Sequence, residues 1–267
     1  MKVVIIGAGN LATHLSIALQ KSGFQIVQIY NRSVSSAKEL SELLQVPYTT
    51  QLEDIVDDAS LYFISVSDDA IESVSKSINP THGLVVHTAG CVSMQIFSEN
   101  FDNYGVFYPL QTFSKGCPID FLDIPIFVEA NTEENLQILH NVANSISRNV
   151  FYATLQEREQ LHLAAIFCCN FVNHLYHLSG NIAQRTGFDF KVLIPLINET
   201  TKKAIFSGNP KKVQTGPAVR KDKKVMQRHL EFLESDPKLH EIYLMFSESI
   251  TKSVHELHEF PRMVFSC

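Results

Sequence analysis

Short apolar runs alternate with amphipathic stretches along the first 152 residues of the chain. Runs rich in Val, Ile, Leu and Phe that lack polar alternation indicate strands buried on both faces. The pattern predicts strands at 2–6, 25–30, near 48, and at 61–66, 83–87, 104–108, 124–129 and 150–152. It predicts helices at 10–22, 36–44 and 132–148, with a further helix start at 67–71. This alternation is typical of a Rossmann-type, doubly wound α/β fold with a mainly parallel sheet.

Capping residues place several of these helix starts. Ser36 and Glu39 fit a capping box for the second helix, and Thr132 is expected to cap the helix that follows it. Asp68 and Asp69 are interpreted as N-caps rather than as catalytic acids, because they come directly before a helical pattern.

After residue 152 the strand signals stop and the pattern becomes helical throughout. Thr154 and Glu157 fit a capping box, and the apolar stretch behind them predicts one long helix that ends near Gly187. Further helices are predicted at 189–207, 222–233 and 237–258, and Pro195 is expected to kink or split the first of them. The change of pattern predicts a Rossmann-type domain at 1–152 and an all-helical domain at 153–267.

A glycine motif lies between the first predicted strand and the first predicted helix. Gly7 suits the tight turn out of the strand, and Gly9 lacks a side chain, so that a pyrophosphate can approach the backbone. Ala12 stands where the third glycine of the motif usually stands, and it is small enough for close packing of helix on strand. The start of the helix, at Asn10 and Leu11, offers unpaired N–H groups to phosphate. The motif therefore predicts a dinucleotide site.

The end of the second strand indicates which dinucleotide binds. In this fold that strand end meets the adenosine ribose, where an acid would accept from the 2′-hydroxyl and repel a 2′-phosphate. Here the residues are Asn31, Arg32 and Ser33, with no acid and one cation. This favours NADP over NAD, whereas the alternative is a solvated loop arginine.

The remaining candidate site residues come from other strand ends and from the long helix. Ligands sit at the carboxyl ends of parallel strands, so Val66, Ser67, His87 and Thr88 are expected to border the nicotinamide half of the cofactor. On the long helix, five polar residues share one face because they are three or four positions apart. They are Asn170, Asn173, His174, His177 and Asn181. This arc is either part of a site or a wetted face or subunit contact, and a metal site is a distant third reading without a nearby carboxylate.

Composition and charge narrow the partners. A net charge of -6 argues against general nucleic-acid affinity. No apolar run is long enough to span a membrane, and the chain enters a strand without a signal-peptide pattern, so a cytoplasmic location is expected. The five cysteines are irregularly spaced and are interpreted as reduced thiols. A basic stretch at 202–224 faces either an anionic substrate or solvent, and residues 215–220 interrupt it as a predicted turn.

Several motifs together resemble one family. They are Gly7-Ala8-Gly9-Asn10, Asn31-Arg32-Ser33, Ser67-Asp68-Asp69-Ala70-Ile71, His87-Thr88-Ala89-Gly90, Pro109-Leu110-Gln111-Thr112-Phe113, His162-Leu163-Ala164-Ala165 with Asn170, and Thr215-Gly216-Pro217 with Arg220, Asp222 and His229. The chain resembles bacterial NADP oxidoreductases that join a Rossmann-like domain to a helical domain of uncharacterised function. These are relatives of pyrroline-5-carboxylate reductase and of the β-hydroxyacid and 6-phosphogluconate dehydrogenases. The resemblance implies an NADP-binding domain and a homodimer built on the helical domain, but no substrate.

One departure limits the chemistry that the resemblance implies. β-Hydroxyacid dehydrogenases place a lysine four residues before the helical asparagine, and here that position is Ile166, before Asn170. Hydroxyacid oxidation by their mechanism is therefore not expected, whereas imine or related reduction stays open.

The leading hypothesis is an NADP-dependent oxidoreductase that transfers a hydride to or from a small metabolite bound between the two domains. The alternative is a non-catalytic NADP(H)-binding sensor or regulatory dimer. What separates the two is a proton donor beside the nicotinamide. The candidates are His87, ranked first, with His162, Thr215 and His174, while Asn170 is expected to hydrogen-bond the substrate.

Overall fold

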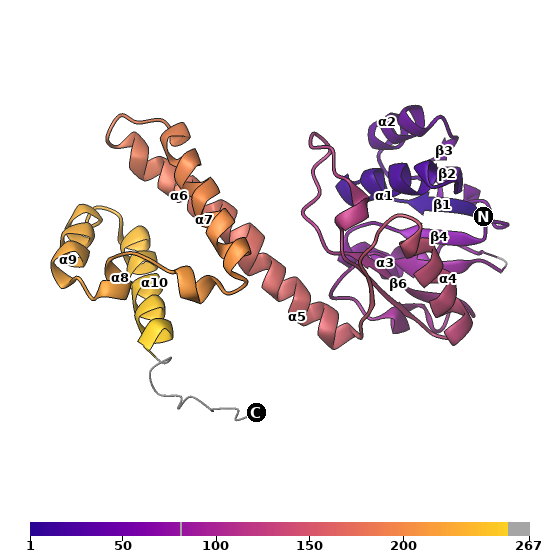
Figure 1. Cartoon of the computed structure of the whole chain (residues 1–267). Helices are drawn as coiled ribbons and strands as arrows, with labels where there is room; N and C mark the ends of the chain where they lie inside the picture. The colour runs from indigo at the N-terminus through magenta and orange to yellow at the C-terminus, as the bar shows by residue number, and fades with distance from the viewer. Residues whose placement is uncertain (81, 256–267) are drawn as a thin grey trace, which may run out of the picture. The chain divides into compact units, whose positions relative to one another are not determined.

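The computed structural model describes residues 1–80 and 82–255. The chain divides into two compact units, Met1–Leu175 and Tyr176–Cys267, and each is described by itself (Figure 1). The first unit therefore includes the start of the long helix as well as the sheet. The domain boundary near residue 152 stays a prediction drawn from the sequence pattern.

In the described part of the first unit, eight strands form one sheet in the order β3-β2-β1-β4-β5-β6-β7-β8. They are β1 (Lys2–Ile6), β2 (Gln25–Tyr30), β3 (Tyr48–Thr49), β4 (Leu61–Ile64), β5 (Leu84–His87), β6 (Tyr104–Pro109), β7 (Ile126–Ala130) and β8 (Val150–Tyr152). Neighbouring strands are parallel except β6 and β7, which are antiparallel. This confirms the Rossmann-like, mainly parallel sheet.

Both faces of the central strands are buried, which explains why these strands lack polar alternation. On one face, β1 contributes Val3 and Ile5 to a core shared with α1 (Asn10–Lys21), α2 (Val34–Leu44) and α4 (Glu133–Asn144). On the other face, Val4 and Ile6 pack with Ile71 of the short helix α3 (Ile71–Ser75). Successive residues of a strand point to opposite faces, so one apolar strand serves two cores.

The structure corrects several local assignments. Helix α2 begins at Val34 with Ser33 as its N-cap, so the capping box at Ser36 is wrong. Ser67 is the N-cap before Asp68 and Asp69, which lie inside the 3₁₀ turn η2 (Asp68–Ala70). The two acids are therefore not the capping residues.

The long helix of the second half is present, with a change of winding inside it. Thr154 and Glu157 form the predicted capping box at the start of α5 (Leu155–Ala165). The chain continues through a π-helical segment, η5 (Ile166–Phe171), into α6 (Val172–Gln184). Gly187 follows with a φ of +83°, the left-handed conformation that suits a glycine after a helix end.

The second unit is helical throughout its described residues. It contains the rest of α6, then the 3₁₀ turns η6 (Phe190–Leu193) and η7 (Pro210–Val213), and the helices α7 (Ile194–Ser207), α8 (Pro217–Arg220), α9 (Lys223–Phe232) and α10 (Pro237–His255). Pro195 lies in the first turn of α7, where a missing N–H costs nothing, so the chain is split there rather than kinked. Residues 217–220 form the short helix α8 instead of a turn.

The end of the last predicted helix, 256–258, lies outside the described residues. None of the helices that the structure describes has the length and apolar character needed to cross a bilayer.

One buried cation fixes α5 to the sheet. Arg158 is 0% exposed, and its Nη1 forms an ion pair with Glu129 of β7. The same nitrogen donates to the Ala153 carbonyl oxygen at 3.1 Å, and Nη2 donates to the Val92 carbonyl oxygen at 3.0 Å. These contacts join three segments: β7, the loop after β5, and the link from β8 into α5.

We expect Glu129→Leu to lower the free energy of unfolding by about 3 kcal/mol or more, because it leaves the Arg158 charge buried without its counter-ion. Chemical denaturation of the purified protein measures the loss. The double variant Glu129→Leu/Arg158→Leu should recover part of it, because no charge is then left unpaired.

Glu134→Leu is the matched control, since Glu134 lies exposed on α4. It should change the free energy of unfolding by no more than about 0.5 kcal/mol. A Glu129→Leu variant as stable as this control would show that the buried pair does not anchor α5.

Candidate functional site

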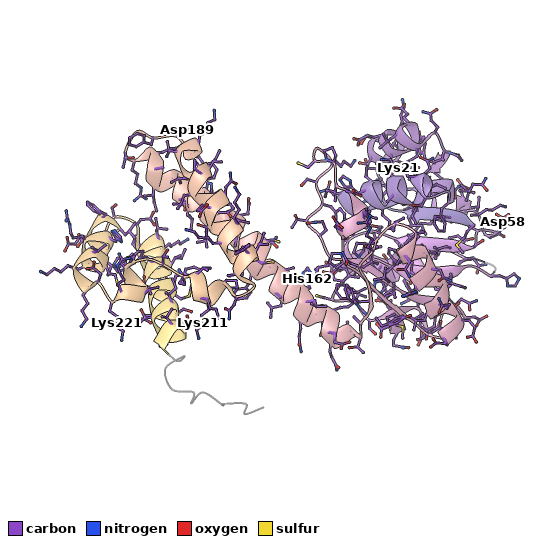
Figure 2. All side chains as sticks on the ribbon, viewed as in Figure 1. Lys21, Asp58, His162, Asp189, Lys211 and Lys221 are labelled. Atoms are coloured by element: carbon purple, nitrogen blue, oxygen red, sulfur yellow. The ribbon has the colours of Figure 1, made fainter. Side chains whose placement is uncertain are left out.

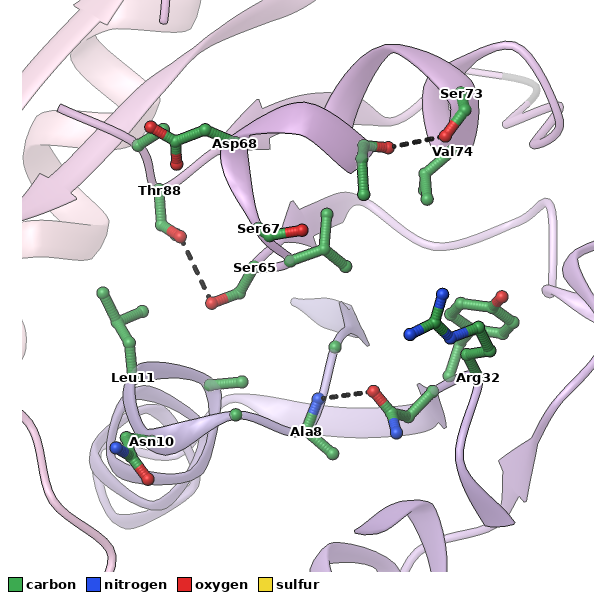
Figure 3. Close-up of a pocket in the computed structure, with 18 of the residues that line it drawn as sticks. Ala8, Asn10, Leu11, Arg32, Ser65, Ser67, Asp68, Ser73, Val74 and Thr88 are labelled. Atoms are coloured by element: carbon green, nitrogen blue, oxygen red, sulfur yellow. Dashed lines mark hydrogen bonds between the residues drawn. The ribbon is translucent and has the colours of Figure 1, made fainter. Parts of the chain in front are cut away.

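A cavity of about 610 Å³ opens at the carboxyl ends of β1, β4 and β5 (Figure 3). Residues from four turns line it: 7–12 after β1, 30–32 after β2, 65–68 after β4, and 88–89 after β5. Ligands of open α/β sheets bind at this edge, where the strand order reverses. The sequence placed Gly7, Gly9, Asn10, Leu11, Asn31, Arg32, Val66, Ser67 and Thr88 here, and the structure brings all of these into the lining. Ser33, which the sequence also placed here, is not part of the lining.

Gly7 makes the turn out of β1 possible. Its φ is +121°, and a Cβ built on it would lie 2.1 Å from the Ser65 carbonyl oxygen. The two residues are forced together because β1 and β4 pair in parallel up to Ile6 and Ile64. The Gly7 N–H also donates to the Tyr30 carbonyl oxygen at 2.7 Å. Only glycine fits this position, for reasons internal to the fold.

Gly9 differs from Gly7, because a side chain added at Gly9 would contact nothing in the described chain. A Cβ built on Gly9 meets no atom within 4 Å, and its φ of -76° suits any residue. Gly9 is the N-cap of α1, no side chain caps this helix end, and its first turn carries no acid. The open space and the uncapped N–H groups fit an anion such as a pyrophosphate.

Asn10 attaches the loop after β6 to the glycine turn. Its Nδ2 donates to the carbonyl oxygen of Phe113 at 3.0 Å, and His14 contacts the Ser114 carbonyl oxygen through Nε2, also at 3.0 Å. The loop after β6 is therefore attached to the first helix.

The end of β2 holds the predicted ribose site. The Asn31 Oδ1 accepts from the Ala8 N–H at 3.2 Å, and its Nδ2 donates to the Ser33 carbonyl oxygen at 3.1 Å. This amide ties the second strand end to the glycine turn. The exposed Arg32 guanidinium borders the cavity, and no hydrogen bond or ion pair within the described chain occupies it. Figure 3 shows Arg32 and the acid Asp68 at opposite ends of the cavity, so Asp68 does not oppose an anion beside Arg32.

The ends of β4 and β5 meet on the other side of the cavity. The Thr88 Oγ1 donates to the Ser65 Oγ at 3.2 Å, and the Thr88 N–H donates to the Ile64 carbonyl oxygen at 3.3 Å (Figure 3). Val66 and Ser67 continue the lining from β4. The rule that ligands meet strand ends predicts these positions for the nicotinamide half, and the geometry is compatible with it.

His87, ranked first as a proton donor, lies in the core rather than in the lining. Its side chain is 0% exposed, and its ring centre lies 5.5 Å from that of Phe97. The Nδ1 accepts from the Ala89 N–H at 3.2 Å, while Nε2 has no partner among the described residues. Burial, helped by the Arg158 charge, lowers the pKa of His87 to about 3, so the ring is neutral near pH 7. Its catalytic role stays a prediction, and the burial favours a structural role for this side chain.

His162 lies on α5 and contacts a residue that the sequence reasoning missed (Figure 2). Its Nδ1 is 3.0 Å from the Oη of Tyr108, at the end of β6. Burial, with the negative charges of Cys91 and Asp68 in support, raises the pKa of Tyr108 to about 12. The only hint in the sequence that Tyr108 belongs to a site was its position at a predicted strand end. Its contact with His162 could not be inferred, because 54 residues separate the two along the chain.

Asn170 is exposed on η5 and is not part of the cavity lining. Thr215 is exposed before α8 in the second unit. Their catalytic roles stay predictions. Within the polar arc, Asn181 Nδ2 lies 3.3 Å from His177 Nε2. Among residues 1–80 and 82–255, no group of three or more His, Cys, Asp or Glu side chains is placed to hold a metal ion.

Comparison with known families matches both halves of the chain. Residues 2–90 match the model of the coenzyme F420-dependent NADP oxidoreductases, and residues 124–250 match a domain of unknown function, DUF2520. The second match begins before the end of the sheet. No curated protein matches the chain.

Solved structures match the whole chain. A putative NADP oxidoreductase from Bacteroides fragilis is 42% identical, with a TM-score of 0.88, over 94% of this chain and 98% of that one. A Thermotoga maritima protein is 22% identical, with a TM-score of 0.79, over 95% and 99%. The 1-pyrroline-5-carboxylate reductase of Streptococcus pyogenes is 16% identical, with a TM-score of 0.63, over 94% and 98%. The last two show a shared fold.

We expect Gly9→Ala to weaken NADPH binding by about tenfold or more, because the methyl group takes the space in which a pyrophosphate would approach the backbone. The protein should stay as stable as wild type, since a Cβ there meets nothing within 4 Å. Calorimetric titration and thermal unfolding measure the two properties.

Gly7→Ala is the matched comparison, because it should lower the free energy of unfolding by about 3 kcal/mol or more through a clash and a strained backbone. Wild-type affinity for NADPH in Gly9→Ala would exclude this turn as the pyrophosphate site.

Proposed function

We propose that this chain, which belongs to the family of the putative NADP oxidoreductase of Bacteroides fragilis, reduces or oxidises a small metabolite by transfer of a hydride to or from NADP(H). NADP is the cofactor, and the family model that covers the glycine turn is that of NADP oxidoreductases. When bound, the nicotinamide supplies or accepts the hydride. The observation that carries the proposal is a cavity at the strand ends whose two ends suit the two halves of the cofactor.

Each part of the cavity has a role in this proposal. Gly9 and the uncapped start of α1, with Asn10 and Leu11, would hold the pyrophosphate. Arg32, with Asn31 and Ser33 beside it, would pair with the 2′-phosphate. Val66, Ser67 and Thr88 would border the nicotinamide. In this proposal the cofactor is held by backbone N–H groups, one guanidinium and neutral side chains. None of these groups has to gain or lose a proton to bind it.

Turnover with a panel of carbonyl and imine compounds tests the proposal, with NADPH and NADH supplied in parallel. We expect at least one compound to be reduced faster with NADPH. Arg32→Ala should cost about 2 kcal/mol of NADPH affinity, or roughly thirtyfold, and leave NADH affinity unchanged, because only NADPH carries the 2′-phosphate.

Two outcomes would count against the proposal. Equal affinity of the wild type for NADPH and NADH would show that Arg32 does not pair with the 2′-phosphate. NADPH binding without turnover of any compound would favour the alternative function, a non-catalytic NADP(H) sensor.

A homodimer is the second part of the proposal, and exposed apolar side chains support it. Within the first unit, Leu163, Phe167 and Phe171 follow one another along α5 and η5 with 55%, 62% and 47% exposure. Within the second unit, Leu196 and Phe206 of α7 are 65% and 96% exposed. Apolar patches of this kind mark interaction surfaces, and a second copy of the chain is the proposed occupant.

The cytoplasmic location of the protein also stays a prediction.

Light scattering at micromolar concentration should give a dimer for the wild type and a monomer for Phe167→Asp, because a charge in an apolar interface is not compensated. Leu43→Asp is the control: Leu43 is 57% exposed on α2, and this variant should stay dimeric. A monomeric wild type would contradict the proposal.

A further inference from the structure

Tyr108 stands beside the turn that borders the nicotinamide end of the cavity. Thr88 and Ala89 line that cavity, and Gly90 follows them. A Cβ on Gly90 would lie 2.8 Å from the Cζ of Tyr108 and 3.0 Å from its Oη. The absence of a side chain at Gly90 therefore lets the phenol hydroxyl reach the carboxyl end of β5.

The protonation state of this hydroxyl suits an acid. Burial, supported by the charge of Asp68 in the cavity lining, raises the pKa of the Tyr108 phenol, so the phenol is protonated near pH 7. A protonated phenol is an acid that can give up one proton.

The position of the phenol is maintained from behind. The Tyr108 side chain is 7% exposed, and its Oη lies 3.0 Å from the Nδ1 of His162. His162 is four residues after Arg158, so both lie on the face of α5 that is attached to the sheet. The Arg158 contacts therefore also orient the imidazole.

We propose that Tyr108 is the proton donor of the oxidoreductase and that His162 is the residue that positions and reprotonates it. This rests on the proposed function and adds its missing acid. The substrate class is a compound with a polar C=O or C=N bond placed next to Thr88 and Gly90.

Reduction transfers one hydride and one proton to the substrate. The carbon of the double bond gains the hydride from reduced nicotinamide, and its oxygen or nitrogen gains the proton of the Tyr108 Oη–H. The phenolate then takes the proton from His162 Nδ1, while Nε2 takes one from a water molecule, which leaves as hydroxide. The neutral imidazole is then in the Nε2–H form, and proton exchange with solvent restores the Nδ1–H form before the next turnover. Oxidation of the alcohol or amine follows the same path in reverse.

The direction of the Tyr108–His162 hydrogen bond separates this proposal from a merely structural contact. For the phenol proton to face the substrate, His162 must carry its proton on Nδ1 and donate it to Oη. Nitrogen-15 NMR of protein labelled at histidine should show the Nδ1–H form for His162, identified as the signal lost in His162→Leu. The Nε2–H form would mean that Tyr108 donates to His162, and it would overturn the proposal.

Kinetics of the NADPH-loaded protein give the second test. The probes are 2-methylpyrroline, pyrroline-5-carboxylate, pyruvate and acetoacetate. Tyr108→Phe should lower kcat by about 100-fold or more on any probe that the wild type reduces, because a general acid contributes this much. NADPH affinity, measured by fluorescence titration, should change by less than about twofold, since Tyr108 is not among the residues that line the cavity near Gly9 and Arg32.

His162 variants separate positioning from folding. His162→Asn keeps an N–H donor near the place of Nδ1 and should retain more activity than His162→Leu. Equal activity of the two, or full activity of Tyr108→Phe, would overturn the assignment while leaving the oxidoreductase function intact. A wild type that binds NADPH but reduces no probe would overturn both.

Discussion

The buried pair of Arg158 and Glu129 is the contact on which the rest of the site depends. A guanidinium with no access to water is costly unless every nearby acceptor is arranged around it, and here the acceptors come from three separate segments. One of these is the loop after β5, and another leads into α5. The loop that follows the β5 end of the cavity and the helix that carries His162 are therefore held by the same guanidinium.

The central strands were predictable because burial on both faces leaves nearly every residue of β1, β4 and β5 apolar. The bounds of β1, β2 and β8 agree with the predicted ones, and those of β4, β5, β6 and β7 lie within two residues of them. Caps were less predictable, because several residues near a helix start can do the same work. Ser33 and Ser36 are both acceptable N-caps, and the chain uses Ser33. The antiparallel pairing of β6 with β7 has no local signal, since it depends on the path of the chain between them.

Most of the cavity lining could be predicted from the sequence, whereas the contact between Tyr108 and His162 could not. Turn residues at the ends of parallel strands are brought together by the fold itself, so Gly9, Arg32 and Thr88 could be grouped without coordinates. His87 and Thr88 are adjacent, yet one side chain enters the core and the other lines the cavity, because a strand alternates its sides. A shift of one residue in the expected register reverses that outcome. The pairing of Tyr108 with His162 joins a strand to a distant helix and needed the structure.

The π-helical segment η5 changes what counting along the long helix can reveal. A π-type turn holds about one residue more than an α-type turn, which turns everything after it by about 100° relative to a regular helix. Three- and four-residue spacing therefore aligns residues within α5 or within α6, but not across η5. Asn170 lies inside this segment, so its direction relative to His162 is set by the extra residue and not by the helical repeat. The insertion acts as a phase offset: one residue gained or lost there would redirect the polar arc while leaving both helices intact.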